Sequence, residues 1–579
     1  MKFHLFVQRL TRNGRFFPLL ITLIFIGVLF LPYYLGYTFV PSDQAFTGIL
    51  MNPEDSQTYF AKMLQGYDGQ WLYTIPFTAE PHEPALVGVF YVWLGQVARL
   101  TGLSLTAVWH LSRIIAQIIL SLTTYWFVAA FTKEGSERWT AYLLALFGSG
   151  LGWVLFLWGQ PYWLDAFPVD FKQPGAHLFF TALTYPHITL GTALILFSVW
   201  GLWRLQEKSS WRLALALGLA HILLGIAYPF LLYLVALVAV LLYLSKWIAE
   251  MRRESAAVDG EERKKPGLFS SFLFPLRSAF FLPLTGQYAI AFLIPLPLYI
   301  YFAYVLYTNE VFAAWDVQAA TLSAPWPHYL LAYGPMLLLG ALHLWRRPSE
   351  RTAVTPLWMW VLAVALLLYA PLNPQRRFVQ GVHVPLAILA TLGLLRVILP
   401  WLTRSRPWQK LVQHPRYSSE GLAKLLIAGF LFVMSLSNLY IIASVSLSAT
   451  LQPPDLLFRP LDEVTAVAWL RENGLETAVL LGDYQTGNYV AAQAGQHVVL
   501  GHWAETVAYE QKVADVARFY AADTPETWRQ QFLQAQHVAY VWYGPREQAL
   551  GGFDPETAVY LQPIYANTTI TIYSVDQTP

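Results

Sequence analysis

The feature that most constrains this chain is a series of apolar runs long enough to cross a lipid bilayer. The first run, residues 16–37, contains no charged side chain, and about 20 apolar helical residues span the ~30 Å hydrocarbon core of a membrane. Ten further runs lie at residues 106–131, 139–158, 187–205, 211–227, 228–248, 287–306, 328–345, 355–371, 380–401 and 424–446. We therefore predict an α-helical polytopic membrane protein with about eleven transmembrane helices.

Composition excludes the common soluble classes. Only 12% of the 579 residues are charged and 56% are hydrophobic, whereas soluble domains carry about 25% charged residues. A water-soluble chain with this composition would expose large apolar patches. The formal net charge of +2 argues against nucleic-acid binding. The chain has no cysteine, which excludes disulfides, thiolate metal ligands and a cysteine nucleophile.

Charges in the loops set the expected orientation. Basic residues precede the first run and no small-residue cleavage site follows it, so we expect an uncleaved anchor with a cytoplasmic N-terminus. If residues 84–101 form an interfacial helix instead of a span, the basic loops all fall on the cytoplasmic side, as the positive-inside rule requires. These basic residues are Lys2, Arg9, Arg12, Arg15, Lys133, Arg138, Arg204, Lys208, Arg212, those of 252–265, Arg346, Arg347, Arg351 and those of 404–416. This topology places the C-terminus outside the cytoplasm.

The C-terminal segment differs from the rest of the chain. Residues 452–579 contain six basic and 15 acidic residues. Helix-like stretches at 462–472, 504–520 and 525–536 alternate with strand-like stretches at 478–481, 497–500, 537–542 and 568–574. This alternation predicts a small extracytoplasmic α/β domain that follows a membrane domain of residues 1–450.

An acidic pair lies in the first outer loop, residues 39–84. The sequence Asn52-Pro53-Glu54-Asp55 opens a predicted helix. In one interpretation these residues only cap that helix, because Asn suits the N-cap, Pro the first helical position, and acids the positive end of the helix dipole. In the other, a carboxylate at the membrane surface acts as general base toward an acceptor hydroxyl or amine.

The second long outer loop contributes further polar candidates. Asp165 and Asp170 lie within it, with His177, and His187 follows at the mouth of the next span. Loop histidines are commonly just solvated. Acids and histidines that face one space could also bind a divalent cation, although their spacing fixes no geometry.

Three arginines lie where the predicted topology does not expect them. Arg376 and Arg377 are adjacent in a short outer loop, against the positive-inside rule. Guanidinium groups bind phosphate in a bidentate manner, and lipid phosphates lie at this depth. Arg113, near the outer end of its span, could serve likewise or could snorkel to the interface.

The sequence contains neither a GxxxxGK[ST] nor an HExxH motif, so a nucleotide-hydrolysis or zinc-protease signature is missing. Three short stretches, Glu54-Asp55-Ser-Gln-Thr-Tyr59, Glu83-Pro84-Ala-Leu86 and Arg113, resemble the GT-C superfamily of integral-membrane glycosyltransferases, similar to protein mannosyltransferases and the aminoarabinose transferase of lipid A. The resemblance covers the membrane part, about residues 1–450.

The resemblance implies a mechanism. Asp55, or its neighbour Glu54, would deprotonate the acceptor, and the sugar would arrive on a polyprenyl phosphate or pyrophosphate. Arg376 and Arg377 would stabilise the departing phosphate, and single displacement would invert the sugar carbon. As further substrate-binding residues we expect Arg113, Asp165, Asp170 and His187.

The expected partners are a polyprenyl-linked sugar donor, a lipid, glycan or protein acceptor and membrane lipids, without nucleic acid, in a bacterial plasma membrane. Two alternatives remain open. A transporter or flippase of a lipid-linked sugar would also need many spans and a polar cavity. A non-enzymatic envelope assembly protein could use its outer domain to bind a partner, and the chemistry of His497, His502 and Glu505 in that domain has no interpretation from sequence alone.

Overall fold

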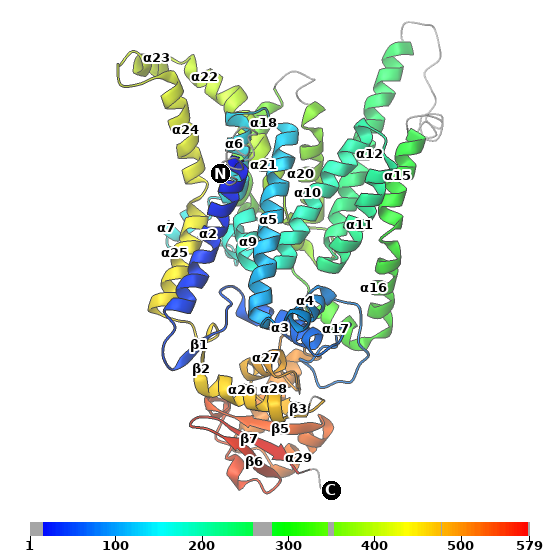
Figure 1. Cartoon of the computed structure of the whole chain (residues 1–579), viewed down its shortest axis with the longest axis vertical. Helices are drawn as coiled ribbons and strands as arrows, with labels where there is room; N and C mark the ends of the chain where they lie inside the picture. The colour runs from blue at the N-terminus through cyan, green and yellow to red at the C-terminus, as the bar shows by residue number, and fades with distance from the viewer. Residues whose placement is uncertain (1–15, 259–280, 346–351, 476, 577–579) are drawn as a thin grey trace, which may run out of the picture. The chain divides into compact units, whose positions relative to one another are not determined.

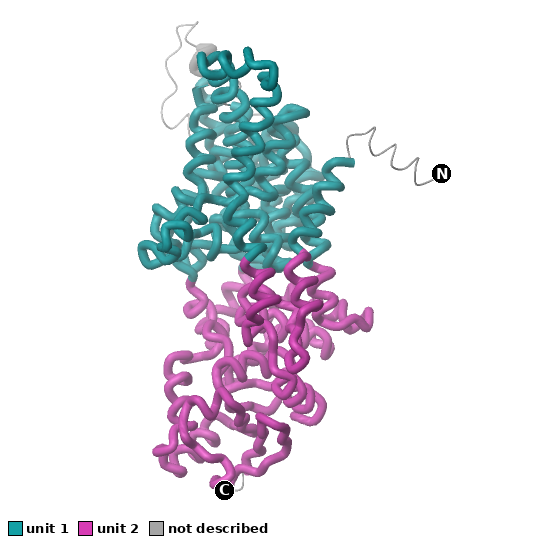
Figure 2. Tube along the Cα trace, turned by 90° about the vertical axis from the view of Figure 1, so that its left-hand side faces the viewer, with its two compact units in different colours: residues 1–29, 113–299, 321–443 teal, residues 30–112, 300–320, 444–579 magenta. Residues whose placement is uncertain are grey.

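The computed structural model describes residues 16–258, 281–345, 352–475 and 477–576. The chain divides into two compact units, which Figure 2 shows in different colours. Unit 1 comprises residues 1–29, 113–299 and 321–443, and unit 2 comprises residues 30–112, 300–320 and 444–579. The basic residues Lys2, Arg9, Arg12, Arg15, Arg346, Arg347 and Arg351 and the loop residues 259–265, on which the predicted topology partly depends, lie outside the described residues.

Unit 1 is a helical bundle (Figure 1). Its helices are α2 (Phe16–Thr38), α5 (Leu105–Phe131), α6 (Ser136–Phe147), α7 (Trp153–Leu157), α8 (Val169–Lys172), α9 (Leu178–Thr184), α10 (Pro186–Glu207), α11 (Trp211–Ala227), α12 (Leu231–Val258), α15 (Phe281–Leu293), α16 (Leu296–Thr308), α18 (Trp326–His343), α20 (Thr355–Leu367), η1 (Gln375–Val379), α21 (His383–Gly393), η2 (Leu394–Ile398), α22 (Leu399–Thr403), α23 (Arg406–Val412), α24 (Ser419–Val433) and α25 (Leu436–Leu451). Four of these helices, α2, α5, α16 and α25, continue into residues of unit 2.

These helices confirm a multi-pass membrane protein. Five helical stretches among the described residues are long and apolar enough to cross a membrane. Two more pairs qualify together, α15 with α16 and α24 with α25, which bend by 41° and 49° at their breaks. Length and composition thus account for five to seven spans, and the shorter apolar helices α11 and α20 fall below that test. The count of eleven stays a prediction.

The predicted span 139–158 is interrupted as well. The apolar run 139–158 divides into α6 and the short α7, because the glycine-rich stretch 148–152 leaves the helical path. Gly150 has no room for a side chain, since a Cβ there would lie 2.5 Å from the Cα of Ala332. The apolar composition of the run concealed this break.

The polar groups at the break between α6 and α7 form hydrogen bonds with residues at the break between α24 and α25, also in unit 1. The Ser149 hydroxyl donates to the Met434 carbonyl over 2.7 Å. The Asn438 side chain donates to the Phe147 carbonyl over 2.9 Å, and the Trp153 amide donates to the Ser437 hydroxyl over 3.2 Å. Backbone groups freed from a helix inside a membrane need such partners.

Unit 2 combines the first outer loop with the C-terminal segment. Its elements are β1 (Gln44–Phe46), α3 (Pro53–Tyr67), α4 (Val89–Thr101), α17 (Glu310–Gln318), β2 (Phe458–Pro460), α26 (Leu461–Asn473), β3 (Val479–Leu481), α27 (Tyr484–Gln493), β4 (His497–Val498), α28 (Tyr509–Tyr520), α29 (Glu526–Ala535), β5 (Val538–Tyr543), α30 (Pro545–Leu550), η3 (Pro555–Thr557), β6 (Leu561–Ala566) and β7 (Thr571–Val575). Strand β1 pairs antiparallel with β2, which joins the two parts of the chain.

The C-terminal segment folds around a five-stranded sheet with the order β4-β3-β5-β7-β6. Strand β3 runs parallel to β4 and β5, whereas β7 runs antiparallel to β5 and β6. The core of this sheet includes the fully buried Leu481, Phe519, Tyr520 and Val541. The four predicted strands correspond to β4, β3, β5 and β7.

Two details of that segment differ from the expectation. The predicted helix 504–520 begins only at Tyr509 as α28, because residues 501–506 form side-chain contacts elsewhere in unit 2. Strand β6 and helix α27 were not expected from the pattern of residues.

Helices α3 and α4 pack backbone against backbone. A Cβ on Gly66 would lie 1.9 Å from the Val92 carbonyl oxygen, and one on Gly95 would lie 1.9 Å from the Met63 carbonyl oxygen. The two glycines therefore allow a close approach that any side chain would prevent. Helix α4 corresponds to the segment 84–101 predicted to lie along the membrane surface, and that location stays a prediction.

Candidate functional site

The acidic pair lies in the first turn of α3. The helix begins with Pro53 after Asn52, whose backbone adopts the left-handed conformation with φ 46°, and the Asn52 side chain forms no capping hydrogen bond to the helix. Glu54 and Asp55 follow at the positive end of the helix dipole. A side-chain cap by Asn52, which the sequence suggested, is therefore not how this helix begins.

Glu54 is bound to helix α27 through its carboxylate. Oε1 accepts a hydrogen bond from the Gln485 side chain over 2.6 Å, and Oε2 accepts one from the Tyr484 hydroxyl over 3.2 Å. Burial and then the charge of Glu54 raise the pKa of Tyr484 well above its usual range, so the phenol stays a donor. The Asn488 side chain also donates to the Glu54 carbonyl over 3.4 Å. Both carboxylate oxygens of Glu54 thus have partners inside unit 2.

Asp55 points to a different part of the C-terminal segment. Its Oδ1 lies 3.1 Å from Nε2 of His502. The Asp55 side chain is 44% exposed, whereas that of His502 is only 6% exposed. The two neighbouring acids therefore differ in accessibility and in partner.

A buried ion pair lies two turns further along α3. The Lys62 ammonium lies 2.8 Å from Oε1 of Glu505, and both side chains are at least 92% buried. The Tyr73 hydroxyl donates to Oε2 of Glu505 over 2.5 Å, and Lys62 lies over the Tyr73 ring at 4.2 Å. Burial, followed by the charge of Glu505, raises the pKa of Tyr73 well above its usual value. This cluster fixes α3 to residues 501–506.

The structure shows the contacts of His497, His502 and Glu505, the residues of the C-terminal segment that had no interpretation from sequence. His502 and Glu505 bind side chains of α3, more than 400 positions away in the chain. His497 instead lies 3.1 Å from the Thr78 carbonyl through Nδ1, and burial lowers its pKa. No local signal could have paired them, because the partners are so distant in sequence.

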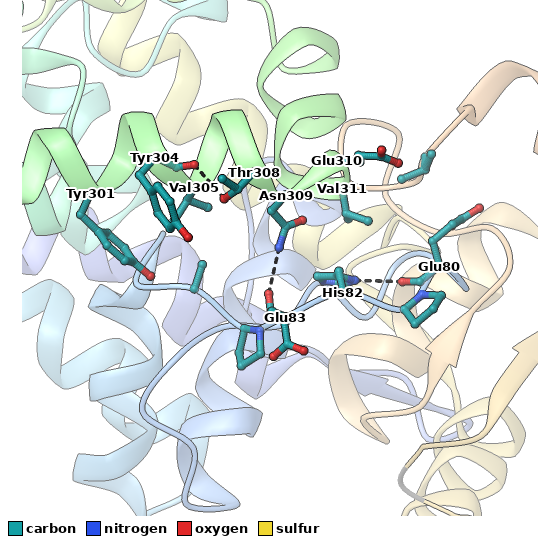
Figure 3. A pocket seen from close by; sticks show the side chains of 14 residues that line it. Glu80, His82, Glu83, Tyr301, Tyr304, Val305, Thr308, Asn309, Glu310 and Val311 are labelled. Atoms are coloured by element: carbon teal, nitrogen blue, oxygen red, sulfur yellow. Dashed lines mark hydrogen bonds between the residues drawn. The ribbon is translucent and has the colours of Figure 1, made fainter.

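Unit 2 also contains a surface cavity of about 580 Å³. Figure 3 shows Tyr301 and Tyr304 of α16 on one side and the loop that carries His82 and Glu83 on the other. The Asn309 side chain donates to the Glu83 carbonyl over 3.0 Å. Nε2 of His82 accepts the Ile75 amide hydrogen over 2.9 Å, and burial lowers the pKa of His82. These hydrogen bonds hold the loop beside the cavity.

A salt bridge closes one end of that loop. The Lys512 ammonium lies 2.7 Å from Glu80, and the Thr78 hydroxyl also hydrogen-bonds Glu80. Although burial alone would raise the pKa of Glu80, the hydrogen bonds from Lys512 and Thr78 lower it.

In unit 1, two of the predicted binding residues, Arg377 and His187, contact the ring of Tyr228. The Arg377 guanidinium lies over the ring of Phe230 at 4.9 Å and over that of Tyr228 at 6.0 Å. The His187 ring contacts Tyr228 edge-on at 5.3 Å and stacks on Tyr185 at 5.6 Å. Within the described residues Arg377 packs on aromatic rings and forms no ion pair. Arg377 belongs to η1, Tyr185 and His187 lie at the N-terminus of α10, and Tyr228 and Phe230 lie between α11 and α12.

The other two arginines, Arg376 and Arg113, form hydrogen bonds within unit 1. The Arg376 carbonyl accepts a hydrogen bond from the Gln173 side chain, and its amide donates to the Thr321 carbonyl over 3.1 Å. Arg113 is 3% exposed, and its guanidinium donates to the Leu183 carbonyl over 3.2 Å. Arg113 therefore lies inside the bundle and does not snorkel to the interface.

The two aspartates of the second outer loop have different surroundings. Asp165 is exposed in a tight turn, with φ 56° after Leu164 at φ 49°. Asp170 is 1% exposed. Its Oδ2 accepts hydrogen bonds from the Gly152 amide over 3.0 Å and from the Ser437 hydroxyl over 2.6 Å, and burial raises its pKa. These contacts favour a role for Asp170 in stabilising the start of α7.

The described part of the chain contains no group of three or more His, Asp or Glu side chains that could hold a metal ion. Glu54 and Asp55 belong to unit 2, whereas Arg113, Asp165, Asp170, His187, Arg376 and Arg377 belong to unit 1. The expectation that the carboxylate and the arginines face one chamber stays a prediction.

No protein-family model and no curated protein sequence matches this chain. Its structure is similar to solved structures of three enzymes. ArnT from Cupriavidus metallidurans bound to undecaprenyl phosphate aligns at 11% identity with a TM-score of 0.49, over 95% of this chain and 97% of ArnT. The oligosaccharyltransferase AglB from Archaeoglobus fulgidus, in complex with an inhibitory peptide and a dolichol-phosphate, aligns at 13% identity and 0.49, over 92% of this chain and 70% of AglB.

The arabinofuranosyltransferase AftD from Mycobacteria aligns at 13% identity with a TM-score of 0.48, over 96% of this chain and 40% of AftD. All three are GT-C glycosyltransferases, the superfamily that the sequence motifs resemble. At these identities and at TM-scores below 0.5, the similarity assigns no substrate, membrane side or catalytic residue to the present chain.

Proposed function

We propose that this protein is a membrane glycosyltransferase that moves a sugar from a polyprenyl-phosphate donor to an acceptor on the outer face of the membrane. Asp55 is its general base. The observation that carries this proposal is the environment of Asp55, whose carboxylate is fixed at one oxygen by His502 and remains 44% exposed. A general base needs both a defined position and access to the proton that it removes.

The neighbouring Glu54 has the other role. Its two carboxylate oxygens accept hydrogen bonds from Gln485 and Tyr484. The carboxylate is therefore bound by side chains of α27. Glu54 attaches the first turn of α3 to α27 and thereby places Asp55.

The proposed donor site lies in unit 1, around Arg377. Its guanidinium packs on Phe230 and Tyr228, and guanidinium groups bind phosphate through parallel N–H donors. His187, which also contacts the Tyr228 ring, is the second residue of this site. Arg376, whose backbone carbonyl accepts a hydrogen bond from Gln173, is the neighbouring cation in the same 3-10 turn.

In the proposed reaction, the acceptor oxygen or nitrogen loses its proton to Asp55 and forms a bond to the anomeric carbon. The bond between that carbon and the phosphate oxygen breaks at the same time, and polyprenyl phosphate leaves with the electron pair. Arg377 stabilises the charge on the leaving phosphate. Attack opposite the leaving group inverts the configuration at the sugar carbon.

The test is sugar transfer by the purified full chain in lipid nanodiscs. The probes are undecaprenyl phosphates that carry ¹⁴C-labelled mannose, glucose or arabinose, with membranes from the native cells as acceptor. We expect Asp55→Asn to lower transfer by at least about 100-fold, because the amide cannot accept the proton. Glu54→Gln, which keeps one acceptor oxygen, is the matched control and should retain substantial activity. If the Asp55→Asn protein transfers sugar at the wild-type rate, Asp55 is not the base. If labelled lipid moves across the bilayer of a proteoliposome while no acceptor is modified, the protein is a flippase instead.

A further inference from the structure

Asp55 and His502 form a carboxylate–imidazole pair whose geometry is the reverse of that in a serine hydrolase. There, the imidazole faces the substrate and the carboxylate lies behind it. Here the carboxylate is the accessible partner, at 44% exposure, and the imidazole is the buried one, at 6%. The accessible group of this pair is therefore the acid.

The second ring nitrogen of His502 excludes the histidine as the group that meets the acceptor. Nε2 is 3.1 Å from Asp55. Nδ1 is buried and has no hydrogen-bond partner among the described residues. The Asp55 carboxylate can only accept, so Nε2–H is the donor in this contact.

The His502 ring is held by two aromatic neighbours and through its backbone. It contacts the Phe77 ring at 6.1 Å and the Trp503 ring at 5.7 Å. The His502 carbonyl accepts the amide hydrogens of Glu505 and Thr506, each over 2.9 Å. A ring with these contacts has little freedom to turn away from Asp55.

The short segment 501–506 is itself fixed to the first outer loop and to α17. The Thr506 hydroxyl donates to the Phe77 carbonyl over 2.7 Å and accepts the Gly501 amide hydrogen over 3.0 Å. The Gln318 side chain donates to the Thr506 carbonyl over 2.9 Å. Glu505 adds the buried bond to Lys62, which lies seven residues after Asp55 and so on the same face of α3.

We propose that His502 is a positioning residue for the transfer reaction, supplied to Asp55 by the C-terminal segment. Its Nε2–H holds the Asp55 carboxylate, whose side chain is 44% exposed, in one orientation. The C-terminal segment is then part of the catalytic machinery and not only a docking domain. This inference rests on the proposed function of Asp55.

The test compares three variants of the full chain with the same labelled donors and native membranes. We expect His502→Ala to lower kcat about 10- to 100-fold, because a loose carboxylate loses the reactive geometry, while KM for the donor changes less than about twofold. His502→Gln, whose amide N–H can still reach Asp55, should recover much of that loss. His497→Gln is the matched control, since His497 is a buried histidine of the same segment that binds the Thr78 carbonyl and does not contact Asp55.

Wild-type kcat in His502→Ala, or no recovery in His502→Gln relative to His502→Ala, would overturn the positioning role. The proposed function has a separate test, because it is contradicted only if the Asp55→Asn variant stays active. A substrate-independent check covers the case in which His502→Ala does not fold. The chain has no cysteine, so the double variant Asp55→Cys/His502→Cys can be treated with a short bis-methanethiosulfonate linker and analysed by mass spectrometry. Intramolecular linkage supports the pairing, and its absence in the folded protein contradicts it.

Discussion

Adjacent residues of like charge have distinct environments in this protein. The carboxylate of Glu54 accepts hydrogen bonds from side chains of α27, whereas that of Asp55 contacts the His502 imidazole. The sequence alone predicted the acidic pair but left open which member reacts. That choice depends on Tyr484, Gln485 and His502, whose approach to α3 no local pattern indicates. Of the other candidates, Asp170 is 1% exposed and accepts a hydrogen bond from the Gly152 amide, two features that its position in the sequence did not indicate.

The Lys62–Glu505 pair gives a stability prediction at the residue scale. Replacing Lys62 by Met leaves the carboxylate of Glu505, which is 4% exposed, without its cation. Removal of one partner of a buried pair costs about 3–5 kcal/mol, so we expect the thermal midpoint of the detergent-solubilised protein to fall by several degrees. The double variant Lys62→Met/Glu505→Gln should recover much of this loss. An unchanged midpoint in the single variant would show that the pair does not stabilise unit 2.

Arg377 gives a binding prediction. Loss of a charge-assisted hydrogen bond costs about 1.5–3 kcal/mol, so Arg377→Ala should weaken the binding of undecaprenyl phosphate about 10- to 100-fold. Arg377→Lys should retain part of the affinity, because a lysine keeps the charge but not the planar fork. The control is Arg204→Ala, since Arg204 pairs with Glu207 on α10 and is expected on the cytoplasmic side. Equal Kd values for Arg377→Ala and the wild type, measured by titration in nanodiscs, would refute the phosphate role.

At the scale of elements, the apolar runs predicted the long helices of the bundle, and alternation predicted four strands of the five-stranded C-terminal sheet. Strand β6 was missed because it contains Pro563 and is mostly exposed, as expected of an edge strand. The break between α6 and α7 was missed because its hydrogen-bond partners lie about 285 positions away, beyond α24.

Helix α27, which holds Glu54, depends on a buried acid. Glu547 accepts hydrogen bonds from the Asp483 amide over 2.8 Å and from the Thr486 hydroxyl over 2.7 Å. Burial raises the pKa of Glu547 to about 7. Because this pKa lies above the ordinary value near 4.5, the contribution of Glu547 to stability is fully present below pH 4.5 and is lost as the pH rises to about 7.

We therefore expect the free energy of unfolding to fall by on the order of 2–3 kcal/mol between pH 4.5 and 7 from this group. The measurement is the thermal midpoint across that range for the wild type and for Glu547→Gln. Subtracting the two profiles isolates this group from other titrating side chains such as Glu80. Parallel profiles would contradict the assignment.

At the scale of the whole molecule, the account depends on two sets of residues that belong to different compact units. The acid and its histidine lie in unit 2, and the arginine with its aromatic rings lies in unit 1. Composition and charge in the loops predicted a multi-pass membrane protein, which the long apolar helices confirm. The sidedness of each loop was inferred from charge alone and is the claim on which the mechanism rests.

The most direct measurement of that claim is cysteine accessibility in the otherwise cysteine-free chain. Single variants Asp55→Cys and Arg377→Cys are treated in intact right-side-out vesicles with a membrane-impermeant maleimide. Lys133→Cys and Arg404→Cys, at exposed positions expected in the cytoplasm, serve as controls. The account predicts that positions 55 and 377 react from outside and that 133 and 404 react only after the vesicles are opened. Labelling of 55 and 377 from opposite sides of the membrane would contradict the proposed reaction.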